Sequence, residues 1–177
     1  MRIGVIADTH IPRAMPSLPL RVKEIFRGVD LILHAGDICN IATLEELEEI
    51  AITIAVSGNR DDAMVHQYVE PKRVVEFANR RIGMIHGHRG GMSELLDALR
   101  AIFLRRPRYG QLYDYLQVQF SDVHCIIFGH THQPYSGMHN GVLLFNPGAV
   151  AAGYGAKPSV GILSISHRSI SGRILYL

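Results

Sequence analysis

Short apolar runs recur along the chain, and many are β-branched and close on Gly, Asp, Asn or Pro. This pattern predicts strands that end in turns, because branched side chains pack well on a pleated surface. The predicted strands cover residues 3–7, 31–34, 52–57, 74–78, 82–86, 125–128, 142–145, 160–165 and 170–176.

Between the early strands, apolar residues repeat with the spacing of one helix face. The predicted helices cover residues 20–26, 41–50, 92–104 and 109–120. Asn40 or Thr43 can supply the N-cap of the second of these helices. The helix over 92–104 has the clearest apolar side, which is formed by Leu95, Leu96, Leu99, Ile102 and Phe103.

The order of these elements predicts an α/β fold. The first third reads βαβαβ, which implies parallel strands joined by right-handed crossovers. Residues 74–86 read as a hairpin that turns at 78–80, and the strand-rich end turns at 139–141 and 169–172. We therefore expect two sheets packed face to face with helices outside, in a single domain over residues 1–177.

Composition narrows the class of protein. Of 177 residues, 18 are Lys or Arg and 16 are Asp or Glu, so the net charge of +2 is too small to indicate nucleic-acid binding by itself. Two cysteines cannot form a disulfide scaffold. Because no apolar stretch has the length of a membrane span and no signal peptide is evident, we expect a cytoplasmic protein. The unusual feature is the ten histidines.

Residues of metal-binding types follow five of the predicted strands. They are Asp8, His10, Asp37, Asn59, His86, His130 and His132. Ligands bind beyond the carboxyl ends of strands in open α/β sheets, so these residues can converge from distant parts of the sequence. Gly36, Gly58 and Gly129 stand before members of the set and permit sharp bends and close approach. Two of the ligand pairs are two residues apart, so an extended chain would place both members on one side.

The types of ligand limit the metal. Imidazole and carboxylate groups without thiolate suit Mn, Fe, Zn, Ni or Co. The seven candidate ligands exceed what one ion usually takes. If one carboxylate is shared, they make two sites of about four ligands each, as a two-metal hydrolase requires.

The chain resembles the calcineurin-like metallophosphoesterases in an ordered set of motifs: Asp8-x-His10, Gly36-Asp37, Gly58-Asn59, His86-Gly87-His88 and Gly129-His130-x-His132. More narrowly, it is similar to the small single-domain phosphodiesterases of the YfcE/MJ0936 type, over residues 1 to about 166. The resemblance implies a four-layer αββα sandwich. It also implies hydrolysis of phosphate esters, phosphodiesters first, by a hydroxide that bridges two divalent ions, with Mn²⁺ expected and Fe, Zn, Ni, Co or Mg as alternatives.

The resemblance also implies a role for each ligand. One ion would be bound by Asp8, His10, Asp37 and His132. The other would be bound by Asp37, Asn59, His86 and His130, so that the carboxylate of Asp37 bridges the two.

Three residues are candidates for a catalytic role: Asn59, Arg60 and His88. The amide of Asn59 binds metal without adding negative charge, and His88 can orient the phosphate or protonate the leaving oxygen. Many larger superfamily members have His where this chain has Arg60, whereas small ones commonly have Cys followed by Asp, which Asp61 matches. Arg60 can hold a phosphate but cannot act as a general acid, because it does not lose its proton. The proton donor is therefore open between His88, a metal-bound water and none.

The remaining histidines have ordinary explanations. His34 is expected to be buried and hydrogen-bonded, and Cys39 to be a packing residue. Structural or surface positions are expected for His66, His124, His139 and His167. The basic run at 105–108 is expected to be a solvated loop; alternatively, residues 89–120 overhang the site and present these arginines to a phosphorylated substrate.

Two other functions use the same fold. A Vps29-like interaction scaffold is free to lose ligands, and all seven are present here. A nuclease needs a nucleic-acid surface, and the chain has no interleaved aromatic and basic stripe. The expected partner is therefore a small phosphate ester, with no membrane contact. Apolar strands near the C-terminus also permit a homodimer or higher homo-oligomer.

Overall fold

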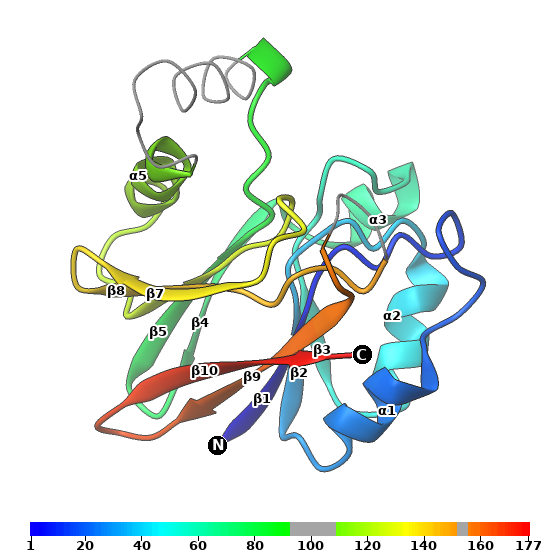
Figure 1. The fold of residues 1–177 in the computed structure, drawn as a ribbon, viewed down its shortest axis with the longest axis horizontal. Coiled ribbons are helices and arrows are strands. Elements are labelled where there is room, and N and C mark those ends of the chain that lie inside the picture. The colour runs from blue at the N-terminus through cyan, green and yellow to red at the C-terminus, as the bar shows by residue number, and fades with distance from the viewer. Residues whose placement is uncertain (93–108, 152–155) are drawn as a thin grey trace.

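Figure 1 shows the computed structural model, which describes residues 1–92, 109–151 and 156–177. Its strands form two sheets of five strands each. The first sheet has the order β10-β9-β1-β2-β3. Its strands are β1 (Arg2–Ile6), β2 (Leu31–His34), β3 (Thr53–Ala55), β9 (Ser159–Ile165) and β10 (Ile170–Tyr176). The strands β1, β2 and β3 pair in parallel, and β9 is antiparallel to both of its neighbours.

The second sheet has the order β4-β5-β6-β8-β7. Its strands are β4 (Lys72–Phe77), β5 (Arg80–Ile85), β6 (Cys125–Ile127), β7 (Tyr135–His139) and β8 (Val142–Asn146). The central strands β5, β6 and β8 are parallel, and the edge strands β4 and β7 pair antiparallel to their neighbours. Both sheets are therefore mixed, as the family resemblance implies.

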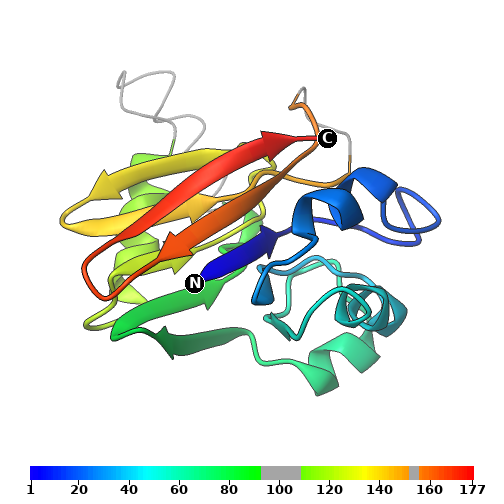
Figure 2. The same cartoon turned by 90° about the horizontal axis from the view of Figure 1, so that it is seen from below.

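Helices cover the outer face of each sheet (Figure 2). The described helices are α1 (Leu20–Phe26), α2 (Ile41–Glu48), α3 (Ala63–Tyr68) and α5 (Gly110–Val118). Phe26 of α1 packs with Ile32 of the first sheet, and Leu116 of α5 packs with Ile126 of the second. The fold is thus the expected four-layer αββα sandwich. Among the described residues, no helix has the length and apolar character to cross a membrane.

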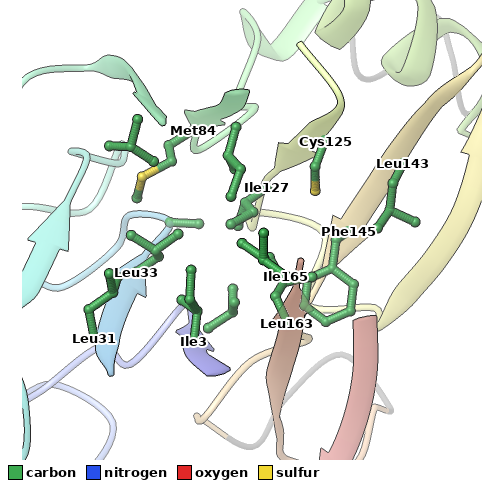
Figure 3. Close-up of a cluster of buried hydrophobic side chains, with 14 of the residues drawn as sticks. Ile3, Leu31, Leu33, Met84, Cys125, Ile127, Leu143, Phe145, Leu163 and Ile165 are labelled. Atoms are coloured by element: carbon green, nitrogen blue, oxygen red, sulfur yellow. The ribbon is translucent and has the colours of Figure 1, made fainter. Parts of the chain in front are cut away.

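The core between the sheets is made of side chains from both inner faces (Figure 3). On β1, Ile3 and Val5 belong to this core, whereas Ile6 packs on the outer face with α1. This division follows from the alternation of side chains along a strand. Burial of both faces explains why β1 reads as a continuous apolar run.

The predicted topology of the first third is confirmed, because β1, β2 and β3 are parallel and are separated by α1 and α2. The turns at 78–80 and 139–141 are also confirmed, since Phe77 pairs with Arg80 and His139 pairs with Val142. The prediction of a turn at 169–172 was wrong. Ile170 already pairs with Ile165, and the intervening Ser166 and Ser169 close the turn through their own hydrogen bonds.

The element boundaries differ from the prediction in physically understandable ways. The run at 52–57 contributes only Thr53–Ala55 to the sheet, because the pairing of β3 with β2 ends at Ala55. The strand β7 was missed, since it is an edge strand with alternating exposure and a central Gly137. The helix α3 was missed because it is short and buries only Val65.

The predicted helix starts and ends can be compared for two helices. Asn40, and not Thr43, is the N-cap of α2, since its side chain accepts a hydrogen bond from Ala42 N at 2.9 Å. The helix expected over 109–120 is present as α5. The helix over 92–104 and the basic run at 105–108 fall almost entirely on residues 93–108, outside the described residues.

Candidate metal centre

The loops that follow β1, β2, β3, β5 and β6 carry the candidate ligands. Main-chain hydrogen bonds join these loops: Asp8 N donates to Gly36 O at 3.0 Å, and Gly129 N donates to His86 O at 3.1 Å. The two sheets are joined as well, since the amide of His130 donates to Asp8 Oδ2 at 3.0 Å. Strand ends from both sheets therefore converge at one edge, as expected for parallel strands.

Two buried carboxylates, Asp8 and Asp37, lie at the middle of this edge. Nε2 of His10 is 3.9 Å from Asp8 Oδ1 and 3.7 Å from Asp37 Oδ2. Nε2 of His86 is 3.4 Å from Asp37 Oδ1, and Nε2 of His132 is 3.4 Å from Asp8 Oδ1. The structure thus gathers these five predicted ligands around one point.

The five side chains form two overlapping groups. One contains Asp8, His10 and His132, and the other contains Asp8, Asp37 and His86. Within each group the ligand atoms all lie within 4.8 Å of one another. Nε2 of His10 and Nε2 of His132 are 3.2 Å apart. Two imidazole nitrogens bound tetrahedrally at 2.0–2.1 Å from one ion would lie about 3.3 Å apart, so the pair fits a common metal ion.

The orientation of His86 is set by the backbone. Its Nδ1 lies 2.8 Å from the carbonyl oxygen of Ala35. A carbonyl oxygen only accepts, so Nδ1 carries the hydrogen and Nε2 faces the two carboxylates. Nε2 is buried and makes no hydrogen bond to a described residue. This is the arrangement of a metal-binding histidine whose second nitrogen is held by a carbonyl.

The charges at the centre call for a cation. Burial alone would lower the pKa of His86, but the carboxylates of Asp37 and Asp8 outweigh it and raise that pKa to about 9. Burial likewise tends to raise the pKa of Asp37, but His86, the Arg60 amide and His10 lower it to about 2. Asp37 is therefore ionised, and its surroundings favour positive charge, which divalent ions supply.

The paired candidate ligands are oriented by left-handed backbone conformations and not by an extended chain. Asp8 and His10 have φ of 52° and 51°, and His130 and His132 have φ of 66° and 56°. The expected extended conformation was therefore wrong, although Asp8 and His10 do reach one group of candidate ligands. Left-handed conformations are costly for residues other than Gly, and they persist where the surrounding structure imposes them, often at functional sites. Asp37, with φ of 56°, belongs to the same set.

The glycine expectation is confirmed at all three positions, since a Cβ at Gly58 would collide with the amide and Oδ1 of Asp37. Gly36 has φ of 91°, which allows the bend that leads into Asp37. A Cβ at Gly129 would lie 2.8 Å from Asp8 Oδ2 and 2.9 Å from Ala7 Cβ. Gly129 is therefore required for the close approach of the loop after β6 to the carboxylate of Asp8.

Two further imidazoles lie beside His86. The ring centroid of His130 is 5.2 Å from that of His86, and the ring centroid of His88 is 5.6 Å from it. The centroids of His88 and His130 are 6.3 Å apart. His88 is exposed, whereas His86 is buried. The three rings therefore form one cluster, with His88 at its surface.

The structure places Asn59 and Arg60 at the rim. Both are exposed. The amide of Arg60 donates to Asp37 Oδ1 at 2.8 Å, so this loop is in direct contact with the carboxylate of Asp37. The side chain of Asn59 makes no hydrogen bond to a described residue. Its role as a ligand stays a prediction that rests on the motif.

Sequence reasoning missed residues that hold the loops in place. Thr9 Oγ1 lies 3.1 Å from Nε2 of His34 and 3.3 Å from Asp37 O. Asn146 Nδ2 donates to Gly129 O at 2.9 Å, which fixes the loop after β6. The sequence offered a signal for each residue: Thr9 stands between two candidate ligands, and Asn146 stands at the end of a strand.

The other predicted positions lie as follows. His34 is buried and hydrogen-bonded, as expected. Cys39 is buried and its Sγ is 3.6 Å from Nδ1 of His10. Burial raises the pKa of this thiol to about 11, against the opposite effect of Arg13. This neutral thiol contacts the candidate ligand His10. His124 and His139 make hydrogen bonds to Arg81 and Asp114.

A protein-family model matches most of this sequence. The model of the calcineurin-like phosphoesterase superfamily domain matches residues 1–168. The chain belongs to this superfamily. The predicted resemblance is thereby confirmed, and the candidate ligands and their surroundings fit divalent metal ions.

Similar proteins agree with this membership of the calcineurin-like superfamily. The chain is 35% identical to a probable metallophosphoesterase of Methanothermobacter thermautotrophicus, over 99% of this chain and 92% of the relative. It is 27% identical to the phosphodiesterase MJ0936 of Methanocaldococcus jannaschii, over 92% of each chain. The fold is similar to Vps29 of Chaetomium thermophilum, with a TM-score of 0.74 at 19% identity, over 99% of this chain and 88% of the other.

Proposed function

We propose that this protein is a binuclear metal-dependent phosphodiesterase. The observation that supports the proposal is the buried pair of carboxylates, Asp8 and Asp37, faced by imidazole nitrogens at 3.4–3.9 Å. Two like charges in one buried site require cations, and the relatives named as metallophosphoesterase and phosphodiesterase agree with a hydrolytic use of them. Phosphomonoesters are further candidate substrates.

The proposed ligands divide between two ions that share Asp37. The first ion is bound by Asp8, His10, Asp37 and His132, and the second by Asp37, Asn59, His86 and His130. The grouping of Asp8, His10 and His132 supports the first set. The contact of His86 with Asp37 and its ring contact with His130 support the second. Ligands without thiolate and with a shared carboxylate suit Mn²⁺, which we propose as the metal.

The bound ions would lower the pKa of a water molecule held between them and neutralise the oxygens of the phosphoryl group. The protein's own residues hold and orient the substrate. The guanidinium of Arg60 lies at the rim, and its main chain is fixed to Asp37. It can bind a phosphate oxygen through paired hydrogen bonds but keeps its proton. We propose that His88, whose exposed imidazole lies beside His86, donates a proton to the leaving oxygen.

The experiment is hydrolysis of bis-p-nitrophenyl phosphate and p-nitrophenyl phosphate by protein treated with a chelator and then reloaded with Mn²⁺. We expect the diester to be cleaved only after reloading. The variant Asp37→Asn should lower kcat/KM about 100-fold or more, since several kcal/mol of charge stabilisation are lost. The control Asp114→Asn removes the same charge from α5 and should retain activity.

If reloaded protein left both esters intact, the proposal would be wrong. A Vps29-like scaffold would give that result. The similarity to Vps29 concerns the fold alone, so it does not favour the scaffold over the enzyme.

A further inference from the structure

A third carboxylate, Asp61, lies next to the centre but bonds to the main chain. Its Oδ1 accepts a hydrogen bond from Cys39 N at 2.6 Å, and its Oδ2 accepts one from Gly58 N at 2.7 Å. Hydrogen bonds from amides to a carboxylate are about twice as strong as neutral ones. Both oxygens of Asp61 thus serve to join two segments of backbone.

These segments are the loops that carry two of the proposed ligands of the second ion. Cys39 is two residues after Asp37 in the loop after β2, and Gly58 directly precedes Asn59 in the loop after β3. The last paired residues of β2 and β3 are His34 and Ala55. Beyond this point the two loops are joined by single hydrogen bonds, from Arg60 N to Asp37 Oδ1 and from Asp62 N to Cys39 O, and by the two bonds to Asp61.

The spacing between the loops is tight. Gly58 lies so close to Asp37 that a side chain at position 58 would collide with the amide and Oδ1 of Asp37. Asp37 and Cys39 also have φ of 56° and 74°, which are conformations that only surrounding contacts maintain. The bond from Cys39 N to Asp61 is one of those contacts.

We propose that Asp61 is a positioning residue that holds the loop of Asp37 and the loop of Asn59 at the separation required for one metal ion to bind both. The inference rests on the proposed function, because these two residues share an ion only in the binuclear site. Asp61 is in neither group of candidate metal ligands among the described residues, and both of its oxygens accept main-chain hydrogen bonds that hold the loops.

The test compares Asp61→Asn with Asp62→Asn. Asparagine has one oxygen and an NH₂ group, so at position 61 it can accept from one amide and must oppose the other with a donor. Asp62 is the matched control. Its Oδ1 accepts from Val65 N at 2.8 Å as the N-cap of α3, a position where asparagine is equally suitable. Its Oδ2 accepts only a long hydrogen bond, from the side chain of Asn40 at 3.4 Å. Both variants lose one negative charge at neighbouring positions.

The readout is Mn²⁺ binding to chelator-treated protein, measured by calorimetric titration and by the electron paramagnetic resonance signal of spin-coupled Mn²⁺ pairs. We expect wild type and Asp62→Asn to bind two ions and give the coupled signal. Asp61→Asn should bind the second ion roughly 10- to 100-fold more weakly and lose the coupled signal, as typically follows from loss of a residue that holds a metal ligand.

Second-ion affinity in Asp61→Asn within twofold of Asp62→Asn would overturn the inference and leave the proposed function standing. Failure of the wild type to bind two ions would overturn both. If Asp61→Asn does not fold, Asp61→Glu keeps both oxygens on a longer stem. Its second-ion affinity should fall measurably below wild type, and an unchanged value would overturn the inference.

Discussion

At the residue scale, His34 links the loop of Asp8 to the loop of Asp37. Its Nδ1 accepts from Gly36 N at 3.2 Å, so Nε2 carries the hydrogen and donates to Thr9 Oγ1 at 3.1 Å. This pair of hydrogen bonds requires the neutral imidazole. Burial agrees with it, since it lowers the pKa of His34 to about 3.

His34 should therefore make the metal-free protein sensitive to acid. The unfolded chain binds a proton at this residue near its ordinary pKa of 6.5, and the folded protein binds one only near 3. The free energy of unfolding should fall as pH drops from 6.5 toward 3, by at most about 1.4 kcal/mol per pH unit from this group. Urea unfolding of wild type and His34→Gln across this range measures the effect.

The His34→Gln variant should be less stable at neutral pH by about 1–3 kcal/mol, since it loses buried hydrogen bonds. Its stability should then decline less steeply with acid than that of wild type. Equal slopes for the two proteins would contradict the neutral, buried state of His34.

The gathering of candidate ligands at one edge could be predicted from the sequence because Asp and His stand at strand ends. Their geometry could not. The left-handed conformations of Asp8 and His10 are imposed by contacts with the loop after β2, such as the hydrogen bond from His10 N to Asp37 O. Such contacts join residues far apart in sequence, and no local pattern reports them.

At the scale of elements, the loop after β6 must lie directly on the carboxylate of Asp8. Gly129→Ala should displace this carboxylate, because the added Cβ would lie 2.8 Å from Oδ2. We expect Mn²⁺ affinity to fall about 10-fold or more, as measured by calorimetric titration. Gly90→Ala is the control, since a Cβ there meets no atom within 4 Å. Equal affinity of the two variants would show that the loop does not constrain Asp8.

Elements with a strong apolar pattern in the sequence were the predictable ones, including the edge strand β10 over its predicted range. The strand β2 is buried on every residue and matches its predicted limits, and α1 matches as well. The edge strand β7 and the short α3 were missed, because each has few buried residues and therefore a weak pattern. Most elements can be predicted from the apolar pattern of their buried residues. An edge strand such as β7 forms through its backbone pairing with β8, which that pattern does not report.

At the scale of the whole molecule, the metal centre depends on the packing of the two sheets. Asp8 and Asp37 follow strands of the first sheet, whereas His86 and His132 follow strands of the second. The sequence predicts two sheets but not their strand order, because the pairing of β1 with β9 joins the two ends of the chain. The complete ligand set therefore exists only in the folded protein.

The number of metal ions per chain tests the central claim most directly. Protein reconstituted with Mn²⁺ and freed of excess metal by gel filtration is analysed by inductively coupled plasma mass spectrometry, alongside Asp37→Ala. We expect about two ions per wild-type chain, as a two-metal hydrolase requires, and fewer than one in the variant that lacks the shared carboxylate. A single ion in the wild type, or the same content in Asp37→Ala as in the wild type, would contradict the binuclear centre.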